Sequence, residues 1–323
     1  MRYIAATLVL LAVLMASACD VHASKPDEPR QMLERMTAAM SQMSYQGTFV
    51  YVQGDRVETI RITHVSDQDG VRERLVALSG PAWEVLRDSS GVRWVLADDH
   101  SVFEDAAFDK PFFPELPFDQ YDQAEISYTL SMGRDARVAG HQVRNLRVLP
   151  RDNFRYGYSL WLEKHSGLLL KWELIDSEGE PLATLMFTDV RLGSEVNKNE
   201  LKPASRLKKF KTVESTLPSG RVQLKASPKW QPDRLPPGFR LTAHRYTAES
   251  ADEIYEHLVY SDGLASVSVY VESEGMGGDW PPRTKKLGTT HAFSRVNGGM
   301  LITVVGDVPK ITVESIGSAV NID

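Results

Sequence analysis

Residues 45–65 read YQGTFVYVQGDRVETIRITHV and contain two runs rich in β-branched and aromatic residues, 45–52 and 59–65, separated by the turn cluster Gln53-Gly54-Asp55. Two such runs with a turn-sized gap predict a β-hairpin. The pattern repeats downstream at residues 72–78, 83–86, 92–96, 101–104, 126–132, 137–138, 142–149, 158–163, 168–175 and 182–190. Because most of these gaps are too short for helical crossovers, the sequence predicts a long antiparallel meander.

A helix is predicted immediately before this meander. After Pro29, apolar residues recur at steps of three and four positions, namely Met32, Leu33, Met36, Met40 and Met43. This spacing indicates an amphipathic helix with a methionine-rich face. One interpretation is that the face packs into the core. The other is that it lines a ligand cavity, because methionine adapts to irregular apolar partners.

The first residues predict export. Arg2 precedes an uncharged, mostly apolar run at 4–18, which is too short to span a bilayer and is followed by small residues. Residues 1–23, Met1 to Ala23, are therefore predicted to be a signal peptide cleaved after Ala23, with the mature chain in the periplasm of a bacterium. A lipoprotein cleavage before Cys19 is the lesser alternative. Cys19 is the only cysteine in the chain, so no internal disulfide is predicted.

The length of 323 residues suggests two domains. Residues 24–200 form the predicted β-rich domain, and periodicity then fades into a linker at 201–227 that is rich in Lys, Ser and Pro. Residues 228–323 form the second predicted domain. It has strand-like runs at 240–246, 256–261, 265–272, 291–296 and 300–305, followed by a helix that begins near Pro309.

Composition and motifs exclude several functions. The 37 Lys and Arg against 43 Asp and Glu give a net charge of −6, which provides no cationic field for a nucleic acid. The histidines of the predicted mature chain, at 64, 100, 141, 165, 244, 257 and 291, are not spaced as helical metal ligands. Gly-x-Ser-x-Gly and Walker motifs are absent from the sequence. The sequence therefore predicts a protein that is not an enzyme and has no cofactor or metal.

An irregular segment concentrates apolar side chains. Residues 108–118, FDKPFFPELPF, hold four phenylalanines and three prolines, and prolines disfavour both helix and sheet. The segment could plug the open end of a curved sheet, or form a mobile lip on an apolar cavity that encloses acyl chains. The basic run 206–211, RLKKFK, is either a solvated part of the linker or a site for lipid phosphates.

Several motifs resemble the RseB/MucB family of periplasmic regulators of an envelope-stress sigma factor. They are YQGTFVY at 45–51, VETIRI at 57–62, RERLVAL at 72–78, GYSLWL at 157–162, GLLL at 167–170, VYSDGLASVSV at 259–269 and THAF at 290–293. The resemblance covers nearly the whole predicted mature chain in the same order.

This resemblance implies an α+β protein. Its N-terminal domain would be an unclosed antiparallel β-barrel with capping helices, like the lipoprotein carriers LolA and LolB, and its smaller C-terminal domain would also be α+β. Family membership implies binding to the periplasmic domain of a transmembrane anti-sigma factor of the RseA/MucA type. Binding would shield that domain from a site-1 protease of the DegS type, and lipopolysaccharide or lipid acyl chains would release it.

The site residues are assigned less directly, from composition and fold resemblance. The residues expected to bind lipid are Phe49, Trp94, Phe112, Phe113 and Trp161, with Lys208 and Lys209 contacting the head group. The residues expected to contact the anti-sigma factor are Tyr260, Asp262, Gly263, His291, Phe293 and Arg295, because they surround the most distinctive turn of the second domain. An equal alternative for the second set is a hairpin turn on a core strand.

A different class of function stays open at this stage, that of a periplasmic lipid or lipoprotein carrier. A carrier needs only the cavity domain, so the second domain favours the regulator. The sequence also leaves the oligomeric state open, including a homo-oligomer.

Overall fold

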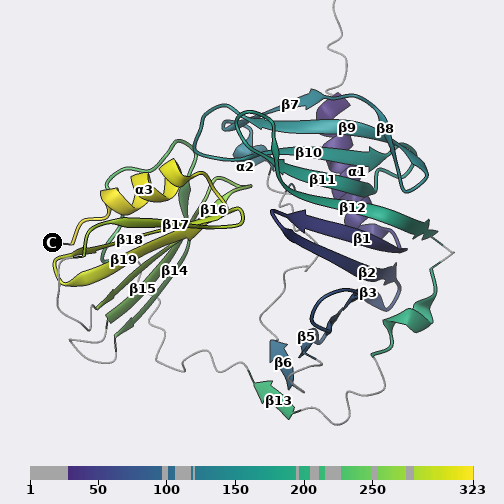
Figure 1. Cartoon of the computed structure of the whole chain (residues 1–323), viewed down its shortest axis with the longest axis horizontal. Coiled ribbons are helices and arrows are strands. Elements are labelled where there is room, and N and C mark those ends of the chain that lie inside the picture. The colour runs from purple at the N-terminus through teal and green to yellow at the C-terminus, as the bar shows by residue number, and fades with distance from the viewer. Residues whose placement is uncertain are drawn as a thin grey trace, which may run out of the picture.

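The computed structural model describes residues 28–96, 101–105, 118, 121–193, 196–203, 211–214, 227–248, 254–273 and 280–322, with backbone alone at 101–105, 211–214 and 247–248. The predicted signal peptide lies outside these residues. The described chain forms two mostly antiparallel β-sheets, each packed with helix, which lie beside one another in Figure 1.

The first sheet has 13 strands and stays open. Its strands are β1 (Tyr45–Gln53), β2 (Arg56–Asp67), β3 (Gly70–Ala77), β4 (Trp83–Asp88), β5 (Gly91–Leu96), β6 (Ser101–Asp105), β7 (Tyr128–Met132), β8 (Ala136–Val138), β9 (His141–Pro150), β10 (Gly157–Glu163), β11 (Leu169–Ile175), β12 (Pro181–Leu192) and β13 (Lys211–Glu214). The order is β13-β6-β5-β4-β3-β2-β1-β12-β11-β10-β9-β7, with β8 on β9, and among the described residues the end strands β13 and β7 do not pair. The predicted unclosed antiparallel sheet is thus confirmed.

Helix α1 (Glu28–Gln42) packs against one face of this sheet and crosses behind β9–β12 in Figure 1. Met32, Leu33 and Met36 on its inner face are buried in the same core as Leu146 and Leu170. The predicted methionine stripe is therefore core packing. The short helix α2 (Tyr121–Ala124) contributes Tyr121 and Ala124 to the same core.

The second domain is a six-stranded sheet covered by one helix. Its strands are β14 (Arg240–Ala248), β15 (Ile254–Ser261), β16 (Ser266–Ser273), β17 (Arg283–Leu287), β18 (Thr290–Asn297) and β19 (Met300–Gly306), in the order β14-β15-β16-β19-β18-β17. Helix α3 (Lys310–Ala319) packs on β18 and β19 with Val313 and Ile316 fully buried. The predicted α+β domain and its terminal helix are confirmed.

Two strands were not predicted. β17 reads RTKKL, which lacks the apolar alternation of a half-buried strand, and four of its five residues are exposed. β13 lies inside the predicted linker, where it pairs parallel to β6 at the end of the first sheet. A 3-10 helix, η3 (Lys198–Leu201), comes just before that range.

Candidate functional site

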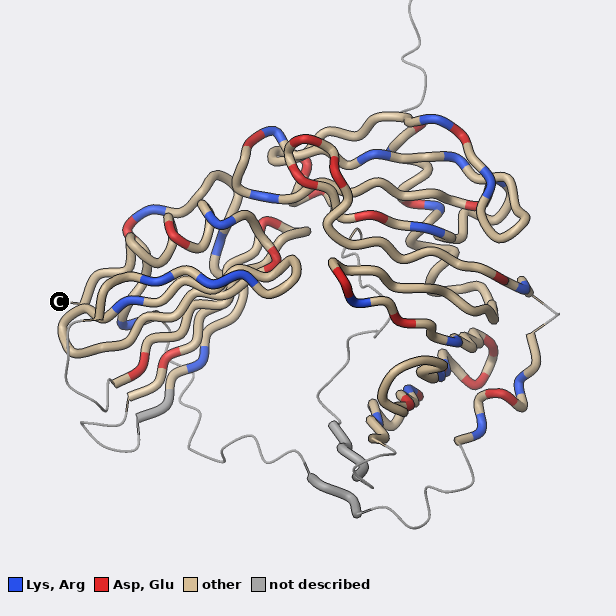
Figure 2. The backbone as a smooth tube through the Cα atoms, in the orientation of Figure 1, with Lys and Arg blue, Asp and Glu red and all other residues tan. Residues whose placement is uncertain are grey.

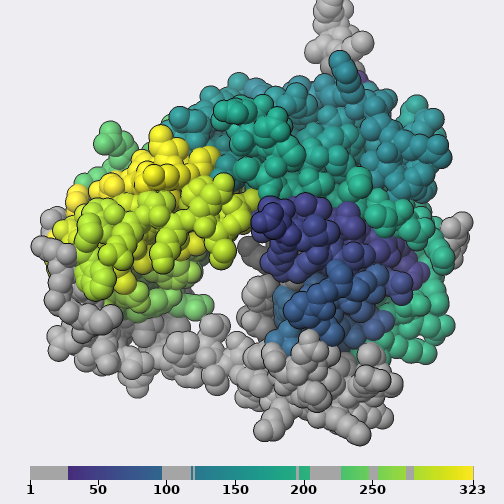
Figure 3. Space-filling model, in the orientation of Figure 1, coloured from purple at the N-terminus to yellow at the C-terminus, as the bar shows by residue number. Residues whose placement is uncertain are grey.

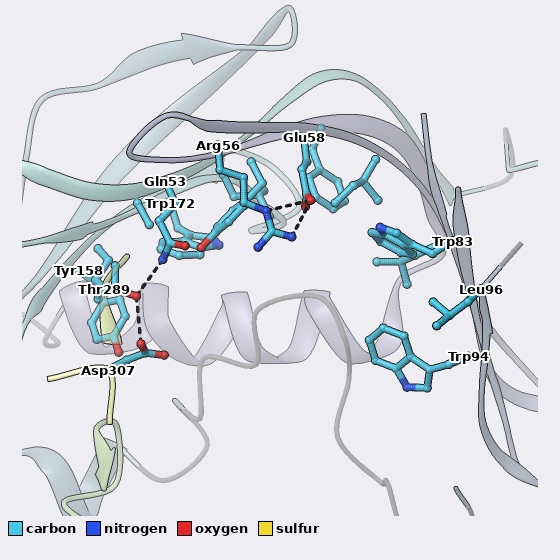
Figure 4. A pocket seen from close by; sticks show the side chains of 17 residues that line it. Gln53, Arg56, Glu58, Trp83, Trp94, Leu96, Tyr158, Trp172, Thr289 and Asp307 are labelled. Carbon is cyan, nitrogen blue, oxygen red and sulfur yellow. Dashed lines mark hydrogen bonds and ion pairs between the residues drawn. The ribbon is translucent and has the colours of Figure 1, made fainter. Parts of the chain in front are cut away.

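An apolar cavity of about 600 Å³ opens on one face of the first sheet (Figure 4). Its walls come from strands β1–β5 and β10–β12 and from two residues of the second domain, Thr289 and Asp307. The lining residues are Phe49, Tyr51, Gln53, Arg56, Glu58, Ile60, Leu75, Trp83, Trp94, Leu96, Tyr158, Trp172, Leu174, Ala183, Leu185, Thr289 and Asp307. In the space-filling view the molecule is hollowed between the second domain and the strands of the N-terminal half (Figure 3).

Strand alternation explains why these residues share a wall. Phe49, Tyr51 and Gln53 are alternate residues of β1, so their side chains point to one face. Trp172 and Leu174 are likewise alternate residues of β11, so their side chains point to one face. Pairing between neighbouring strands brings the apolar side chains of that face side by side. α1 covers the rest of this face, so the cavity is the part of the sheet that the helix leaves open.

The cavity has a polar end at the domain junction. The Gln53 side-chain amide donates to Thr289 Oγ1 at 2.9 Å, and Thr289 Oγ1 donates to Asp307 Oδ1 at 3.0 Å. Arg56 donates from Nε and Nη2 to Glu58 Oε1 at 2.9 and 2.6 Å. Figure 4 shows Gln53, Thr289 and Asp307 at one end, the Arg56–Glu58 pair in the middle and the indole rings of Trp83 and Trp94 at the other end.

Burial also changes the pKa values of tyrosine side chains in the cavity wall. It raises the pKa of the Tyr51 hydroxyl, and the nearby Asp307 carboxylate raises that pKa further. It raises the pKa of Tyr158 as well, so both phenols stay neutral at physiological pH. The arrangement suits a molecule with an apolar chain and a polar or charged group at its end.

The residues predicted to bind lipid have different locations. Phe49 and Trp94 line the cavity. Trp161 does not, because it is three positions from the cavity residue Tyr158 on β10 and therefore faces the other side of the sheet. There the Lys171 ammonium lies 4.2 Å from the centre of its ring. Phe112, Phe113, Lys208 and Lys209 lie outside the described residues.

The residues predicted to contact a partner are largely buried. The Asp262 carboxylate and the Arg155 guanidinium form an ion pair across the domain junction, and both side chains are 0% exposed. Arg155 also donates to Asp152 Oδ1 at 2.9 Å and to the Pro237 carbonyl at 2.5 Å. Asp262 Oδ1 accepts from the backbone N–H groups of Leu264 and Ala265. Gly263 has φ of 103°, which this tight turn requires.

The other residues of that set also have structural roles. Tyr260 and Phe293 lie in the core of the second domain. His291 is buried, and its Nδ1 donates to the Val308 carbonyl at 2.8 Å. Arg295 donates from Nε to the Gly317 carbonyl at 2.9 Å and so holds the end of α3. In this arrangement these side chains support the fold and the domain junction, and direct contact with a partner stays a prediction.

Sequence reasoning missed the contacts that join the two domains, although it named Asp262 as a candidate partner residue. Arg155 and Asp262 are 107 positions apart, and Gln53 and Thr289 are 236 apart. Thr312 Oγ1 on α3 also donates across the junction, to the Phe154 carbonyl at 2.6 Å. No local pattern marks such pairs, because each residue alone is an ordinary polar residue beside a turn or a strand end.

The described residues contain no group of three or more His, Cys, Asp or Glu side chains that could hold a metal ion. Within the same residues, no helix is both long enough and apolar enough to cross a membrane.

Comparison with known proteins gives matches over nearly the whole chain. Sequence profiles of the MucB/RseB N-terminal and C-terminal domains match residues 28–205 and 224–321. The chain is 31% identical to the sigma factor AlgU regulatory protein MucB of Pseudomonas aeruginosa, over 96% of each chain. It is 29% identical to the sigma-E factor regulatory protein RseB of Haemophilus influenzae, over 98% of this chain and 96% of the relative.

Solved structures match in the same way. The crystal structure of MucB in complex with MucA(peri) is 30% identical, has a TM-score of 0.71, and covers 91% of this chain and 98% of that chain. The crystal structure of MucB alone is 28% identical, has a TM-score of 0.58, and covers 91% and 97%. The overall arrangement of the present chain is thus more similar to that of MucB in the complex.

Proposed function

The chain belongs to the MucB/RseB family, and from this premise we propose that it binds the periplasmic segment of a transmembrane anti-sigma factor of the MucA/RseA type. The observation that carries the proposal is the similarity to MucB bound to MucA(peri), which extends over 91% of this chain. Relatives are named as regulators of the AlgU and sigma-E factors, so the regulated output would be transcription by an envelope-stress sigma factor. The predicted signal peptide supports a periplasmic location for this binding.

The proposed consequence of binding is protection from proteolysis. A site-1 protease of the DegS type must reach an extended segment of the anti-sigma factor before it can cut. A protein that occupies that segment lowers its accessible fraction in proportion to occupancy. This mechanism needs no catalytic group on the regulator, which is consistent with a family of regulatory proteins rather than enzymes.

We further propose that lipid reverses this protection. The cavity of about 600 Å³ is lined by indole, phenyl and aliphatic groups and has polar groups at one end, which suits the acyl chains and head group of lipopolysaccharide or another lipid. A lipid that binds the unoccupied regulator better than the complex weakens partner binding by the same factor. Because Thr289 and Asp307 of the second domain also line the cavity, a bound lipid would contact both domains.

The same cavity supports a second candidate function, that of a periplasmic lipid or lipoprotein carrier. A carrier would take up acyl chains and pass its cargo to an acceptor protein. The second domain has no evident task in that function, since all but two of the cavity residues belong to the first sheet. For this reason the regulator is preferred.

Protease protection tests the proposal. The mature protein is mixed with the purified periplasmic segment of the anti-sigma factor, and cleavage by the site-1 protease is followed with and without lipopolysaccharide. The regulator is expected to slow cleavage as occupancy rises, and lipopolysaccharide is expected to restore it. An unchanged cleavage rate at saturating protein would refute the proposed function. Transfer of lipoprotein to an acceptor, with no effect on cleavage, would instead support the carrier.

A further inference from the structure

The second sheet ends in an unusual edge strand, β17 (Arg283–Leu287). Within the described part of the chain, β17 pairs with β18 on one side and with no strand on the other. Four of its five residues are exposed, and Leu287 is 83% exposed. An edge of this kind presents unpaired backbone groups that can accept another extended chain.

The adjoining turn fixes which backbone groups face outward. Leu287 and Thr290 pair across the two-residue turn Gly288-Thr289, in which Gly288 has φ of 60°. Residues that flank a two-residue turn exchange hydrogen bonds with one another, and bonded and non-bonded pairs then alternate along the ladder. The backbone N–H and C=O groups of Lys286 and Thr284 therefore point away from β18, toward the exposed edge.

The positive charge of β17 determines which kind of strand can pair with its outer edge. Arg283, Lys285 and Lys286 give the strand three cations, and neither lysine forms an ion pair with another described residue. Figure 2 shows this basic stretch in blue on the second domain. Like charges facing one another across a ladder are unfavourable, so a second copy of β17 is disfavoured, whereas an acidic strand is attracted.

A groove of about 550 Å³ lies beside the same strand. Arg283 and Lys285 of β17 line it together with Trp280, and Val296 and Leu301 contribute apolar surface. The Arg283 guanidinium lies 5.4 Å from the centre of the Trp280 ring. An added strand would place alternate side chains on the face of the sheet where this groove opens, so the groove can accept an apolar side chain.

We propose that the outer edge of β17 binds an extended acidic segment of the anti-sigma partner by strand addition. This inference rests on the proposed function and names the surface that carries it. Backbone hydrogen bonds at Thr284 and Lys286 supply affinity, the three cations select acidic neighbours, and the groove beside Trp280 holds an apolar side chain of the same segment.

Binding of the purified anti-sigma periplasmic segment to the full mature protein tests this surface. K285E/K286E reverses the charge of the edge, and Lys286→Pro removes one outward N–H. The matched control K164E/K202E makes the same charge change at exposed lysines of the first domain. We expect K285E/K286E to weaken binding about tenfold and the control to change it less than about threefold. Lys286→Pro is expected to weaken binding while leaving the thermal unfolding midpoint near that of the wild type.

Amide hydrogen exchange provides a second measurement that needs no variant. In the complex, the amides of Thr284 and Lys286 should exchange more slowly than in the unbound protein. One result would contradict this surface: the wild type binds the segment, these amides stay unprotected, and K285E/K286E binds equally well. In that case β17 is not the binding surface, but the proposed function stands. If the wild type does not bind the segment at all, the proposed function itself fails.

Discussion

At the scale of single residues, the ion pair between Arg155 and Asp262 determines how the two domains dock. Their side chains are fully buried, and the pair is completed by Asp152, the Pro237 carbonyl and two backbone N–H groups. A buried ion pair contributes little net stability compared with a well-packed apolar pair, but removal of one partner leaves the other charge uncompensated. The pair therefore makes domain docking specific rather than simply strong.

Arg155→Met is expected to destabilise the protein by about 3–5 kcal/mol, because the Asp262 carboxylate then stays buried without its cation. The free energy of unfolding from denaturant titration measures this loss. Arg155→Met/Asp262→Asn should recover part of it, since the remaining charge is removed. Lys310→Met, which breaks an exposed pair with Glu314, should cost less than about 0.5 kcal/mol. A loss in Arg155→Met no larger than in this control would contradict the argument.

His257 gives the protein a predictable response to acid. Burial lowers the pKa of its imidazole, and the Arg245 guanidinium on β14 lowers it further. The ring also stacks on Tyr270 and contacts Ser268 Oγ at 3.1 Å, both on β16. Since the unfolded imidazole has a pKa of about 6.5, the unfolded state binds a proton first as pH falls, and the native state loses stability below that value.

His257→Gln should therefore remove part of the decrease in unfolding free energy between pH 7.5 and about pH 5, and Arg245→Gln should make the decrease shallower. Denaturant titrations at several pH values measure both slopes. Wild-type pH dependence in His257→Gln would show that the imidazole has no part in it.

At the scale of elements, the packing of helix α3 against the second sheet depends on one glycine. Gly317 faces the Phe293 ring, and a Cβ atom there would lie 2.3 Å from Phe293 Cδ1. Gly317→Ala would gain about 1 kcal/mol of helix propensity, but the buried ring has little room to move. We expect a net destabilisation of about 1–2 kcal/mol, because overpacking a core costs more than the propensity gain.

Chemical unfolding of the full chain measures this difference. Ser318→Ala is the control, because it adds helix propensity at an exposed position of the same helix and should be neutral or slightly stabilising. Equal effects of the two substitutions would show that α3 can shift away from Phe293 at little cost.

The elements also show what a sequence can predict. Strands whose apolar residues alternate, such as β2 and β16, were predicted within a few residues because one face of each strand is buried. β17 escaped prediction because an edge strand needs little burial and is protected by charge, so RTKKL has the composition of a loop. Phe49 and Trp94 were predicted to bind lipid from composition and fold resemblance, and both line the cavity. Trp161 was named on the same grounds but lies outside the cavity lining, and composition does not indicate which face of a strand a ring occupies.

At the scale of the whole molecule, the site depends on contacts that join distant parts of the chain. Thr289 and Asp307 complete the cavity wall only because the second domain is docked through Arg155, Asp262 and Thr312. The distinctive SDG turn at 261–263 suggested a partner surface, and in the structure its aspartate forms one half of the buried docking pair. Such a role can be recognised only when the position of the other domain is known.

Filling the cavity should separate lipid response from partner binding. Ala183 is 3% exposed and lines the cavity from β12, so Ala183→Phe would place a ring where acyl chains are proposed to lie. Binding of a fluorescent fatty acid is expected to weaken about tenfold or more, since the remaining volume no longer accepts a chain. Ala136→Phe, at an exposed position of β8, is the matched control and should bind the fatty acid normally.

The same variant then tests how the two ligands are coupled. Ala183→Phe should still protect the anti-sigma segment from the site-1 protease, because the proposed partner surface lies on β17, but lipopolysaccharide should no longer reverse the protection. Coupling between two ligands is reciprocal, so a variant that cannot bind lipid has no free energy with which to displace the partner. Full reversal by lipopolysaccharide in Ala183→Phe, together with lost fatty-acid binding, would place the lipid signal at a site other than this cavity.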